Sequence, residues 1–254
     1  MITSRANGRV KAARALGEAK ERRRTGLFVD EGEDALRAAL AAGITPVEVF
    51  VDDDLGSDRI ADELFAAGAK VLRCSGEVMG ALSALSSTSR AVGVFRANDL
   101  PPLAAGSPAS AVGLHLHGVA DPGNLGTLLR SAQGFGPAHV ALAEGCADPL
   151  SPRAVRASMG ALYSVPVITL REAPDLPVIA LDARGDRTLA ELAPKAPVAF
   201  ALGGERAGLP DEITTSAGAV ARIPLAEGSE SLNVAIAGAL ALYELRRVQG
   251  RVQT

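Results

Sequence analysis

Short apolar runs separated by helical patterns fill the second half of the chain. Their length and β-branched content are typical of strands, which we expect at 111–117, 138–142, 165–169, 178–181, 198–202 and 219–223. Helical patterns fall between most of the runs, the clearest at 125–135 and 154–162, and a long Ala-rich helix is expected after the last run at 231–247. Strands that alternate with helices form a parallel sheet with helical crossovers, so the pattern predicts an α/β fold.

The first half predicts a smaller α/β module. Helical patterns alternate there with short strand candidates, and we expect helices at 10–24, 34–42, 60–67 and 77–85 and strands at 27–29, 47–51, 69–72 and 91–95. Residues 97–110 then differ in composition, because three prolines among Gly, Ser and Ala prevent a regular helix or a central strand. We therefore expect one domain at 1–96, a linker at 97–110 and a second domain at 111–254.

The net charge of −3 conceals an uneven distribution. Residues 1–24 hold eight basic side chains and two acidic ones, a surplus of six positive charges, so residues 25–254 carry −9. A basic segment on an acidic body favours a polyanionic partner over a membrane surface, because this segment lacks an apolar face with aromatic anchors. A solvated, partly disordered N-terminus is the alternative.

Other features of the composition restrict the class of protein. Cys74 and Cys146 lie far apart and form neither a metal-type spacing nor a disulfide framework, so we expect reduced thiols in a cytoplasmic protein. The first residues lack the apolar core of a signal peptide, and no apolar run approaches the ~20 residues that span a bilayer. His115 and His117 share one face of an expected strand without further ligands nearby, so we expect no metal site.

The first candidate site follows the strand expected at 111–117. Asp121-Pro122-Gly123-Asn124 opens a helix, and Asn124 suits an N-cap because its side-chain oxygen can accept a backbone N–H of the first turn. Arg130 lies six residues further on, and its guanidinium can bind a phosphate through two parallel hydrogen bonds. An ordinary helix cap with a surface arginine is the alternative.

Two further candidate loops follow the strands expected at 198–202 and 219–223. The first is the turn Gly203-Gly204-Glu205, where glycines let a ligand approach the backbone, and its alternative is a plain tight turn. The second runs from Ile223-Pro224-Leu225 to Ser231-Leu232-Asn233, whose hydroxyl and amide groups can cap a helix or bind a polar ligand. Because ligands of parallel sheets bind at the carboxyl ends of strands, we expect both loops to line one pocket.

Several enzyme classes lack their signatures in this chain. Neither Gly-x-Gly-x-x-Gly nor Gly-x-x-x-x-Gly-Lys-Ser/Thr follows an expected strand, which disfavours nicotinamide and flavin enzymes and P-loop NTPases. Ser158 and Ser164 have no matching His and Asp motif, so a hydrolase triad is unsupported.

Together these segments resemble the SpoU/TrmH type of RNA 2′-O-methyltransferase, in the SPOUT class. Asp121 to Arg130 with Phe135-Gly136 is similar to the first motif of that family, Leu202-Gly203-Gly204-Glu205 to the second, and Ile223-Pro224-Leu225 with Ser231-Leu232-Asn233-Val234 to the third. The first half, from Asn7 to Gly32, resembles the RNA-binding substrate module often fused ahead of this catalytic domain.

The resemblance implies a fold, a cofactor and partners. The fold would be a ribosomal-protein-like α/β RNA-binding module followed by a parallel-sheet SPOUT domain with a trefoil knot, although knots are rare among proteins. The cofactor would be S-adenosylmethionine (AdoMet), and the protein would form a homodimer that binds RNA.

The resemblance also assigns roles to individual residues. The catalytic group comprises Asn124, Arg130, Glu205, Ser231 and Asn233, and the cofactor-binding group comprises Leu202, Gly203, Gly204, Ile223, Leu225 and Leu232. His117 departs from the family, where an acid often follows the first strand, and we expect this to affect packing rather than chemistry.

The implied chemistry agrees with these residue types. A sulfonium methyl is already electrophilic, so no metal is needed, but a ribose 2′-hydroxyl must be made nucleophilic. Arg130 is expected to neutralise the adjacent phosphate and stabilise the developing alkoxide, while Ser231 and Asn233 orient the ribose. Large-subunit ribosomal RNA is the expected substrate. The alternatives are a transfer RNA 2′-O-methyltransferase and a non-catalytic RNA-binding or ribosome assembly factor of the same fold.

Overall fold

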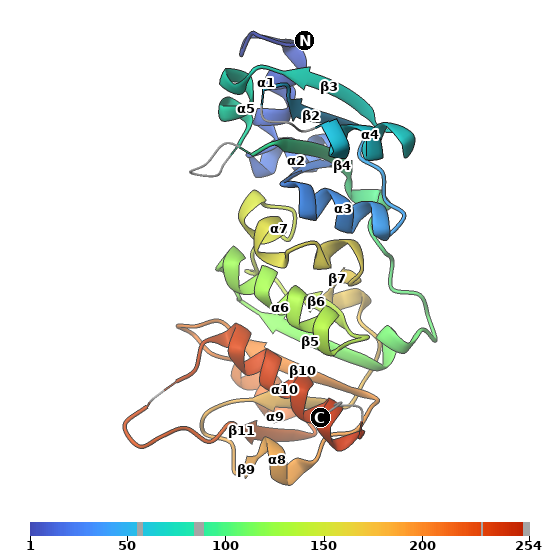
Figure 1. Ribbon diagram of the computed structural model, residues 1–254. Helices are drawn as coiled ribbons and strands as arrows, with labels where there is room; N and C mark the ends of the chain where they lie inside the picture. Colours follow the sequence, from blue (N-terminus) through green and yellow to red (C-terminus); the bar gives the residue numbers. More distant parts are fainter. Residues whose placement is uncertain (55–57, 84–88, 230, 251–254) are drawn as a thin grey trace. The chain divides into compact units, whose positions relative to one another are not determined.

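The computed structural model describes residues 1–54, 58–83, 89–229 and 231–250 (Figure 1). By their internal contacts they divide into two compact units. Unit 1 comprises Met1–Leu100 with Leu150–Tyr163, and unit 2 comprises Pro101–Pro149 with the chain from Ser164 onward. The short segment at 150–163 therefore packs with the N-terminal half, although it follows two strands of the second half in sequence. The domain limits expected from composition remain predictions.

Unit 1 contains a four-stranded mixed sheet in the order β1-β4-β2-β3. Its strands are β1 (Leu27–Glu31), β2 (Glu48–Asp52), β3 (Lys70–Cys74) and β4 (Ala91–Arg96). β4 is antiparallel to both β1 and β2, whereas β2 and β3 are parallel. The helices are α1 (Gly8–Ala15), α2 (Ala19–Thr25), α3 (Glu33–Ala41), α4 (Asp58–Ala66), α5 (Gly76–Leu82) and α7 (Pro152–Ser158). The last residues of the helix expected at 77–85 lie outside the described residues.

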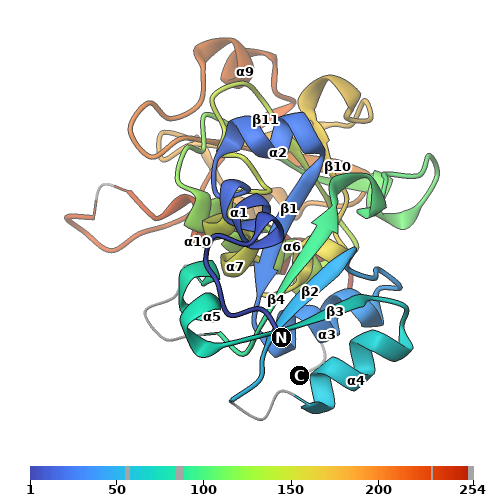
Figure 2. The ribbon, with the colours of Figure 1, turned by 90° about the horizontal axis from the view of Figure 1, so that it is seen from above.

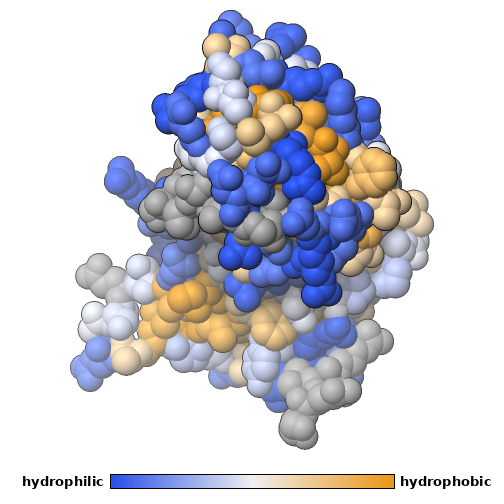
Figure 3. All heavy atoms as spheres, turned by 45° about the horizontal axis from the view of Figure 1, so that its top comes forward, coloured by the Kyte–Doolittle hydropathy of each residue, from blue (hydrophilic) through white to orange (hydrophobic). Residues whose placement is uncertain are grey.

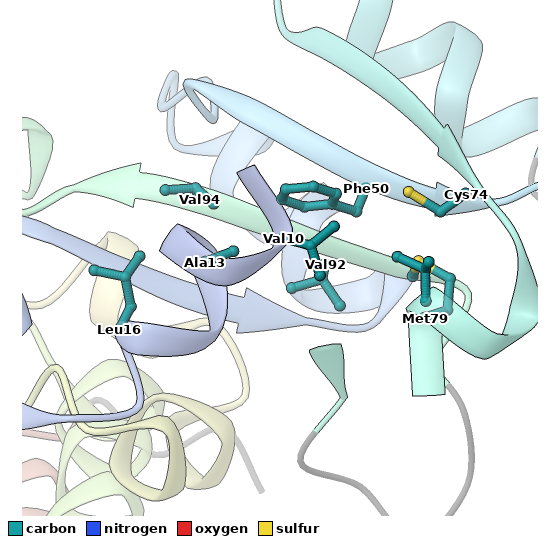
Figure 4. Packing of buried hydrophobic residues seen from close by; sticks show 9 residues of the cluster. Val10, Ala13, Leu16, Phe50, Cys74, Met79, Val92 and Val94 are labelled. Atoms are coloured by element: carbon teal, nitrogen blue, oxygen red, sulfur yellow. The ribbon is translucent and has the colours of Figure 1, made fainter. Parts of the chain in front are cut away.

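The core of unit 1 follows the alternation of side chains along β4. Val92 and Val94 face α1 and α5, where Val10, Ala13 and Met79 join them in one buried cluster (Figures 2 and 4). Gly93 points to the other face, against Leu36 of α3. Phe28, Phe95 and Tyr163 stack there, with ring centroids 5.1 to 6.4 Å apart. Each face of this small sheet is therefore covered by helices or by the segment at 150–163.

Segment 150–163 is held to β1 by a buried hydrogen bond as well as by packing. The hydroxyl of Tyr163 donates to Oδ2 of Asp30 at 3.0 Å, and Arg156 forms an ion pair with Glu31 at 3.1 Å. Burial raises the pKa of Asp30 to about 6, although the Tyr163 hydrogen bond opposes this shift. Tyr163 is thus a core residue of unit 1.

Unit 2 is built on a seven-stranded parallel sheet in the order β7-β6-β5-β10-β8-β11-β9. Its strands are β5 (Val112–His117), β6 (His139–Leu142), β7 (Val167–Thr169), β8 (Val178–Leu181), β9 (Arg187–Thr188), β10 (Val198–Gly203) and β11 (Ala219–Arg222). Six of them match the expected runs to within two residues at each end. The two-residue β9 was not expected, because it is too short to leave a periodic pattern.

The helices of unit 2 lie on both faces of this sheet. α6 (Pro122–Phe135) and α10 (Val234–Val248) pack together over β5 and β10, where Gly238 lies against Leu128, Leu202 and Leu114. α9 (Asp211–Ser216) covers the opposite face through Ile213, which packs on Ala180 and Ala201. α8 (Leu189–Leu192) is a single turn that follows β9. In the part of the chain that the structure describes, no helix is long and apolar enough to cross a membrane.

The histidines His115, His117 and His139 lie on strands β5 and β6 of unit 2. His115 and His139 are buried with ring centroids 5.7 Å apart, and neither Nε2 atom has a hydrogen-bond partner within the described chain. Burial, and then the neighbouring imidazoles of His139 and His117, lowers the pKa of His115 to about 4. Among the described residues, no three His, Cys, Asp or Glu side chains are placed to share a metal ion. Both cysteines are free, Cys74 buried and Cys146 half-buried.

Candidate active site

The candidate site lies at the carboxyl ends of four neighbouring parallel strands. β5, β10, β8 and β11 are adjacent in the sheet and run in one direction, so the loops that follow them meet at one edge. These loops begin at Gly118, Asp182, Gly204 and Ile223. The two loops that the sequence singled out are therefore brought together by strand order.

The glycine turn after β10 is shaped by contact between backbones. A Cβ atom on Gly203 would lie 2.0 Å from the carbonyl carbon of Gly208, and one on Gly204 would lie 2.3 Å from the carbonyl oxygen of Gly118. Gly208 adopts the left-handed region at φ +68°, and its N–H donates to Gly204 at 2.8 Å. Only glycine fits at 203 and 204, because main chain rather than a movable side chain occupies the space.

α6 begins earlier than the sequence analysis expected. Its N-cap is Asp121, whose side chain accepts the backbone N–H of Asn124 at 3.0 Å, so the expectation that Asn124 caps the helix was wrong. Pro122 explains the difference, since its fixed φ favours the first helical position and places Asp121 just before it. The side chain of Asn124 is consequently available for other contacts.

Asn124 joins two loops that are remote in sequence. Its Nδ2 donates to Oε1 of Glu205 in the glycine turn, and its Oδ1 accepts from Nδ2 of Asn233 at 3.0 Å. Asn233 is the N-cap of α10, because its Oδ1 accepts the backbone N–H of Ala235 at 2.9 Å and that of Ile236 at 3.3 Å. Three of the five predicted catalytic residues therefore form one hydrogen-bonded chain across the starts of α6 and α10.

A cavity of about 560 Å³ opens beside this chain. This volume lies within the range of ~300–1,000 Å³ found for sites that bind small molecules and cofactors. All six predicted cofactor-binding residues line it, namely Leu202, Gly203, Gly204, Ile223, Leu225 and Leu232, together with Glu205, Ser231 and Asn233. Within the described residues the Ser231 hydroxyl has no hydrogen-bond partner, which leaves it free for a ligand.

The loop after β8 adds a wall that the sequence analysis missed. Asp182, Ala183 and Arg184 line the cavity, and so does Arg206 of the glycine turn. Asp182 accepts two hydrogen bonds from the Arg184 guanidinium, each 3.0 Å long, and these bonds hold the pKa of Asp182 below its usual value. The position of Asp182 directly after an expected strand was a usable signal, because that is where ligand loops begin.

Arg130 stands apart from this cavity in the single chain. It is exposed on α6 and does not belong to the residues that line the cavity. Six helical residues separate it from Asn124, a rise of about 9 Å and a rotation of roughly 240° at ~100° per residue, so the two side chains leave the helix in different directions. One chain therefore does not bring the predicted catalytic arginine to the predicted cofactor pocket.

The glycine turn and the cavity together fit a nucleoside-type cofactor such as AdoMet. The backbone of the turn is open because residues 203 and 204 carry no side chain, and apolar Leu202, Ile223 and Leu232 lie beside polar groups. An apolar pocket with a few placed polar groups is the usual form of such a site. The fold and the site thus define a parallel α/β protein with a cavity between loops at the carboxyl edge of its sheet.

Comparison with known proteins identifies the family. Residues 111–243 match the SpoU rRNA Methylase family, and residues 7–93 match the MRM3-like substrate binding domain. The chain therefore belongs to the SpoU rRNA methylase family.

Relatives of full length support this assignment. An uncharacterised tRNA/rRNA methyltransferase of Synechocystis is 33% identical over 100% of this chain and 96% of its own. The 23S rRNA (guanosine(2553)-2′-O)-methyltransferase RlmP of Bacillus subtilis is 29% identical over 96% of this chain and 98% of its own.

A solved structure supports both the fold and the cofactor. The crystal structure of an AdoMet-bound rRNA methyltransferase from Sinorhizobium meliloti superposes with a TM-score of 0.84, at 32% identity over 97% of each chain. At the level of the family, the predicted SPOUT-type α/β fold, RNA methyltransferase class and AdoMet cofactor are confirmed. The trefoil knot remains a prediction.

Proposed function

We propose that this protein transfers a methyl group from AdoMet to a ribose 2′-hydroxyl of large-subunit ribosomal RNA. The observation that carries the proposal is the convergence of all six predicted cofactor-binding residues on one cavity, beside the hydrogen-bonded chain of Asn124, Glu205 and Asn233. Similarity to the 23S rRNA 2′-O-methyltransferase of Bacillus subtilis supports ribosomal RNA over transfer RNA.

The residues of the cavity suggest how AdoMet is held. Gly203 and Gly204 offer open backbone, Leu202, Ile223, Leu225 and Leu232 offer apolar surface, and Ser231 offers a free hydroxyl. When bound, AdoMet supplies a sulfonium methyl that is already electrophilic. Asn233 and Asn124 keep the starts of α10 and α6 in fixed register, so that the polar edge of the cavity does not reorganise during the reaction.

Activation of the ribose hydroxyl falls to Arg130 and its polar neighbours. The guanidinium is permanently charged, so it binds the phosphate next to the target ribose and stabilises the negative charge that develops on the 2′-oxygen. Ser231 and Asn233 orient the ribose, a group that distinguishes RNA from DNA.

The protein acts as a homodimer in this proposal, with α10 at its interface. Ile236, Leu240 and Tyr243 are 50%, 38% and 39% exposed and lie at helical spacing on one stripe of α10. An exposed apolar stripe on a well-packed helix favours association with a second copy. The position of Arg130 supports the same arrangement, since Arg130 does not line the cavity of its own chain and a second chain can supply it.

Methyl transfer to RNA tests the function directly. Wild-type protein with methyl-labelled AdoMet is expected to label an unmodified 23S ribosomal RNA transcript, and mapping of 2′-O-methyls should locate one ribose. Arg130→Ala should lose more than ~100-fold in rate, the usual size of one charge-stabilising group. Arg171→Ala, an exposed arginine of the same unit, serves as the control. Labelling of transfer RNA but not of 23S ribosomal RNA would identify transfer RNA as the substrate. Equal rates for Arg130→Ala and Arg171→Ala would exclude a role of Arg130 in methyl transfer.

Mixing of inactive variants tests the dimer. If Arg130 acts on the cavity of a second chain, an equal mixture of Arg130→Ala and Glu205→Ala should regain about one quarter of wild-type activity, because half of the dimers are mixed and each holds one intact site. No recovery would place both residues in one chain. Sedimentation of Leu240→Glu, with the exposed Phe65→Glu of α4 as control, should yield monomers only for the α10 variant.

A further inference from the structure

The two N-terminal helices carry four exposed cations whose side chains form no ion pair within the described residues. Lys11 and Arg14 lie on α1, Lys20 and Arg23 lie on α2, and none of the four side chains forms an ion pair or hydrogen bond with another described residue. Other basic residues of this segment are engaged, since Arg5, Arg9 and Arg24 pair with Glu77, Glu48 and Glu21. We call the four free cations the α1–α2 cation surface.

These cations lie on helices that are packed against the sheet of unit 1, not on an unstructured segment. The inner side of α1 is buried through Val10 and Ala13, which pack with Leu16 against the sheet (Figure 4). The buried guanidinium of Arg22 donates to the carbonyls of Leu16 at 2.8 Å and Gly17 at 2.7 Å, which locks the turn between the helices. The basic segment, for which the sequence left a disordered tail open, is therefore a folded surface.

The spacing of the cations leaves repulsion that no ion pair of these four side chains relieves, although Lys20 also attracts Glu21. Lys11 and Arg14 are three residues apart on one helix, as are Lys20 and Arg23, so each pair lies on one helix face about 5–6 Å apart at Cβ. Of the two acids in this segment, Glu21 is bound to Arg24. A row of phosphates offsets such repulsion, whereas an isolated anion reaches one pair only.

The chemistry of this surface favours nucleic acid over a membrane. Neither α1 nor α2, which are described in full, exposes a large hydrophobic side chain that could enter a bilayer. Hydrophilic residues also cover much of the face seen in Figure 3. Exposed lysine and arginine side chains are the usual protein contacts to the phosphate backbone of a nucleic acid, and they bind it without regard to base sequence.

We propose that the α1–α2 cation surface binds the phosphate backbone of the substrate RNA. It sets the affinity for RNA and not the rate of methyl transfer. This inference rests on the proposed function, because it takes RNA as the substrate.

Salt-dependent binding of full-length protein tests the surface. Two surface variants are compared, Lys11→Gln with Arg14→Gln and Lys20→Gln with Arg23→Gln. The control is Lys70→Gln with Lys195→Gln, two exposed lysines elsewhere in the chain. Each is titrated with a fluorescent, unmodified 23S ribosomal RNA transcript between 50 and 300 mM KCl. Each surface pair should lower the slope of log K against log salt by about 2, one for each phosphate contact. Affinity should fall by about fivefold for each side chain removed, the upper end for an exposed charge pair.

Methyl transfer separates binding from chemistry. The surface variants should raise KM for RNA while kcat and the Kd for AdoMet stay at wild-type values, and Lys11→Arg with Lys20→Arg should bind like wild type. Equal RNA affinities and salt slopes for the surface and control variants would overturn the proposal, as would a loss confined to kcat. Failure of wild-type protein to methylate any RNA would refute the proposed function instead, while the binding comparison still decides whether the surface holds RNA.

Discussion

A single methyl group added at Gly203 should disrupt the cofactor cavity without unfolding the protein. The Cβ of Gly203→Ala would lie 2.0 Å from the carbonyl carbon of Gly208, 2.2 Å from its oxygen and 2.2 Å from the nitrogen of Leu209. Ordinary contact between such atoms requires about 3.5 Å, so the two arms of the turn must separate by roughly 1.5 Å. That movement breaks the hydrogen bond from Gly208 to Gly204, now 2.8 Å long.

The magnitude follows from these two effects. Overpacking of a tight site costs about 1–3 kcal/mol, and loss of one backbone hydrogen bond about 0.5–1.5 kcal/mol, so we expect about 1.5–4.5 kcal/mol in all. A domain with a typical stability of ~5–15 kcal/mol remains folded after such a loss. The glycine turn lines the cavity, so AdoMet binding should weaken at least tenfold, which corresponds to about 1.4 kcal/mol.

Urea unfolding and titration calorimetry with AdoMet measure both effects. AdoMet should raise the unfolding midpoint of unit 2, which holds the cavity, and this identifies the relevant transition. Gly134→Ala on α6 is the control, because a Cβ there meets nothing within 4 Å and should stabilise the helix by about 0.5–1 kcal/mol. An unchanged midpoint and an unchanged Kd for Gly203→Ala would refute the proposed backbone contact and its role in the pocket.

Three further perturbations test the buried groups. Because burial lowers the pKa of His115 from 6.5 in the unfolded chain to about 4, the folded protein is fully stable above pH 6.5 and loses stability as the pH falls toward 4. The loss amounts to about 3 kcal/mol. The urea midpoint of His115→Asn should therefore fall less steeply than that of wild type between pH 7 and pH 4. Asp30 has the opposite sign, since a carboxyl with its pKa raised to about 6 costs stability as the pH rises from 3.8 through 6. Tyr163→Phe removes a hydrogen bond that favours the charged form of Asp30, so it should destabilise the protein by about 1–3 kcal/mol at pH 7.5 and by less at pH 5. Equal losses of stability at the two pH values would contradict this account. Arg22→Met leaves the carbonyls of Leu16 and Gly17 without their guanidinium donor, so the free energy of unfolding should fall by about 2–3 kcal/mol. Urea unfolding followed by circular dichroism measures this loss, and the control Arg23→Met should stay within about 0.5 kcal/mol of wild type.

Local sequence pattern was enough to predict most of the strands and the position of the glycine turn. Apolar runs such as 198–202 are too short for buried helices, and a glycine pair that directly follows one of them has few uses apart from a turn or a close backbone approach. The resemblance to the motifs of the family also rests on residues close in sequence. Its assignment of six residues to the cofactor remains a prediction, and the structure adds that all six line one cavity.

Features that depend on one or two residues were predicted wrongly from the sequence or were not predicted. Asn124 and Asp121 both suit a helix N-cap, and only the observed start of α6 at Pro122 decides between them. Continuous helical composition at 10–24 concealed the break between α1 and α2, where Arg22 turns inward to bind two carbonyls. Strand β9 is held by its neighbour β11 rather than by its own preference.

The contacts between segments that are distant in sequence became known from the fold alone. Asn124 binds Glu205 across 81 residues and Asn233 across 109, and Tyr163 reaches Asp30 across 133. These contacts result from the strand order β5-β10-β8-β11 and from the packing of segment 150–163 on unit 1. Strand order depends on how whole faces bury one another, a free energy summed over many distant residues, so no short stretch of sequence contains it.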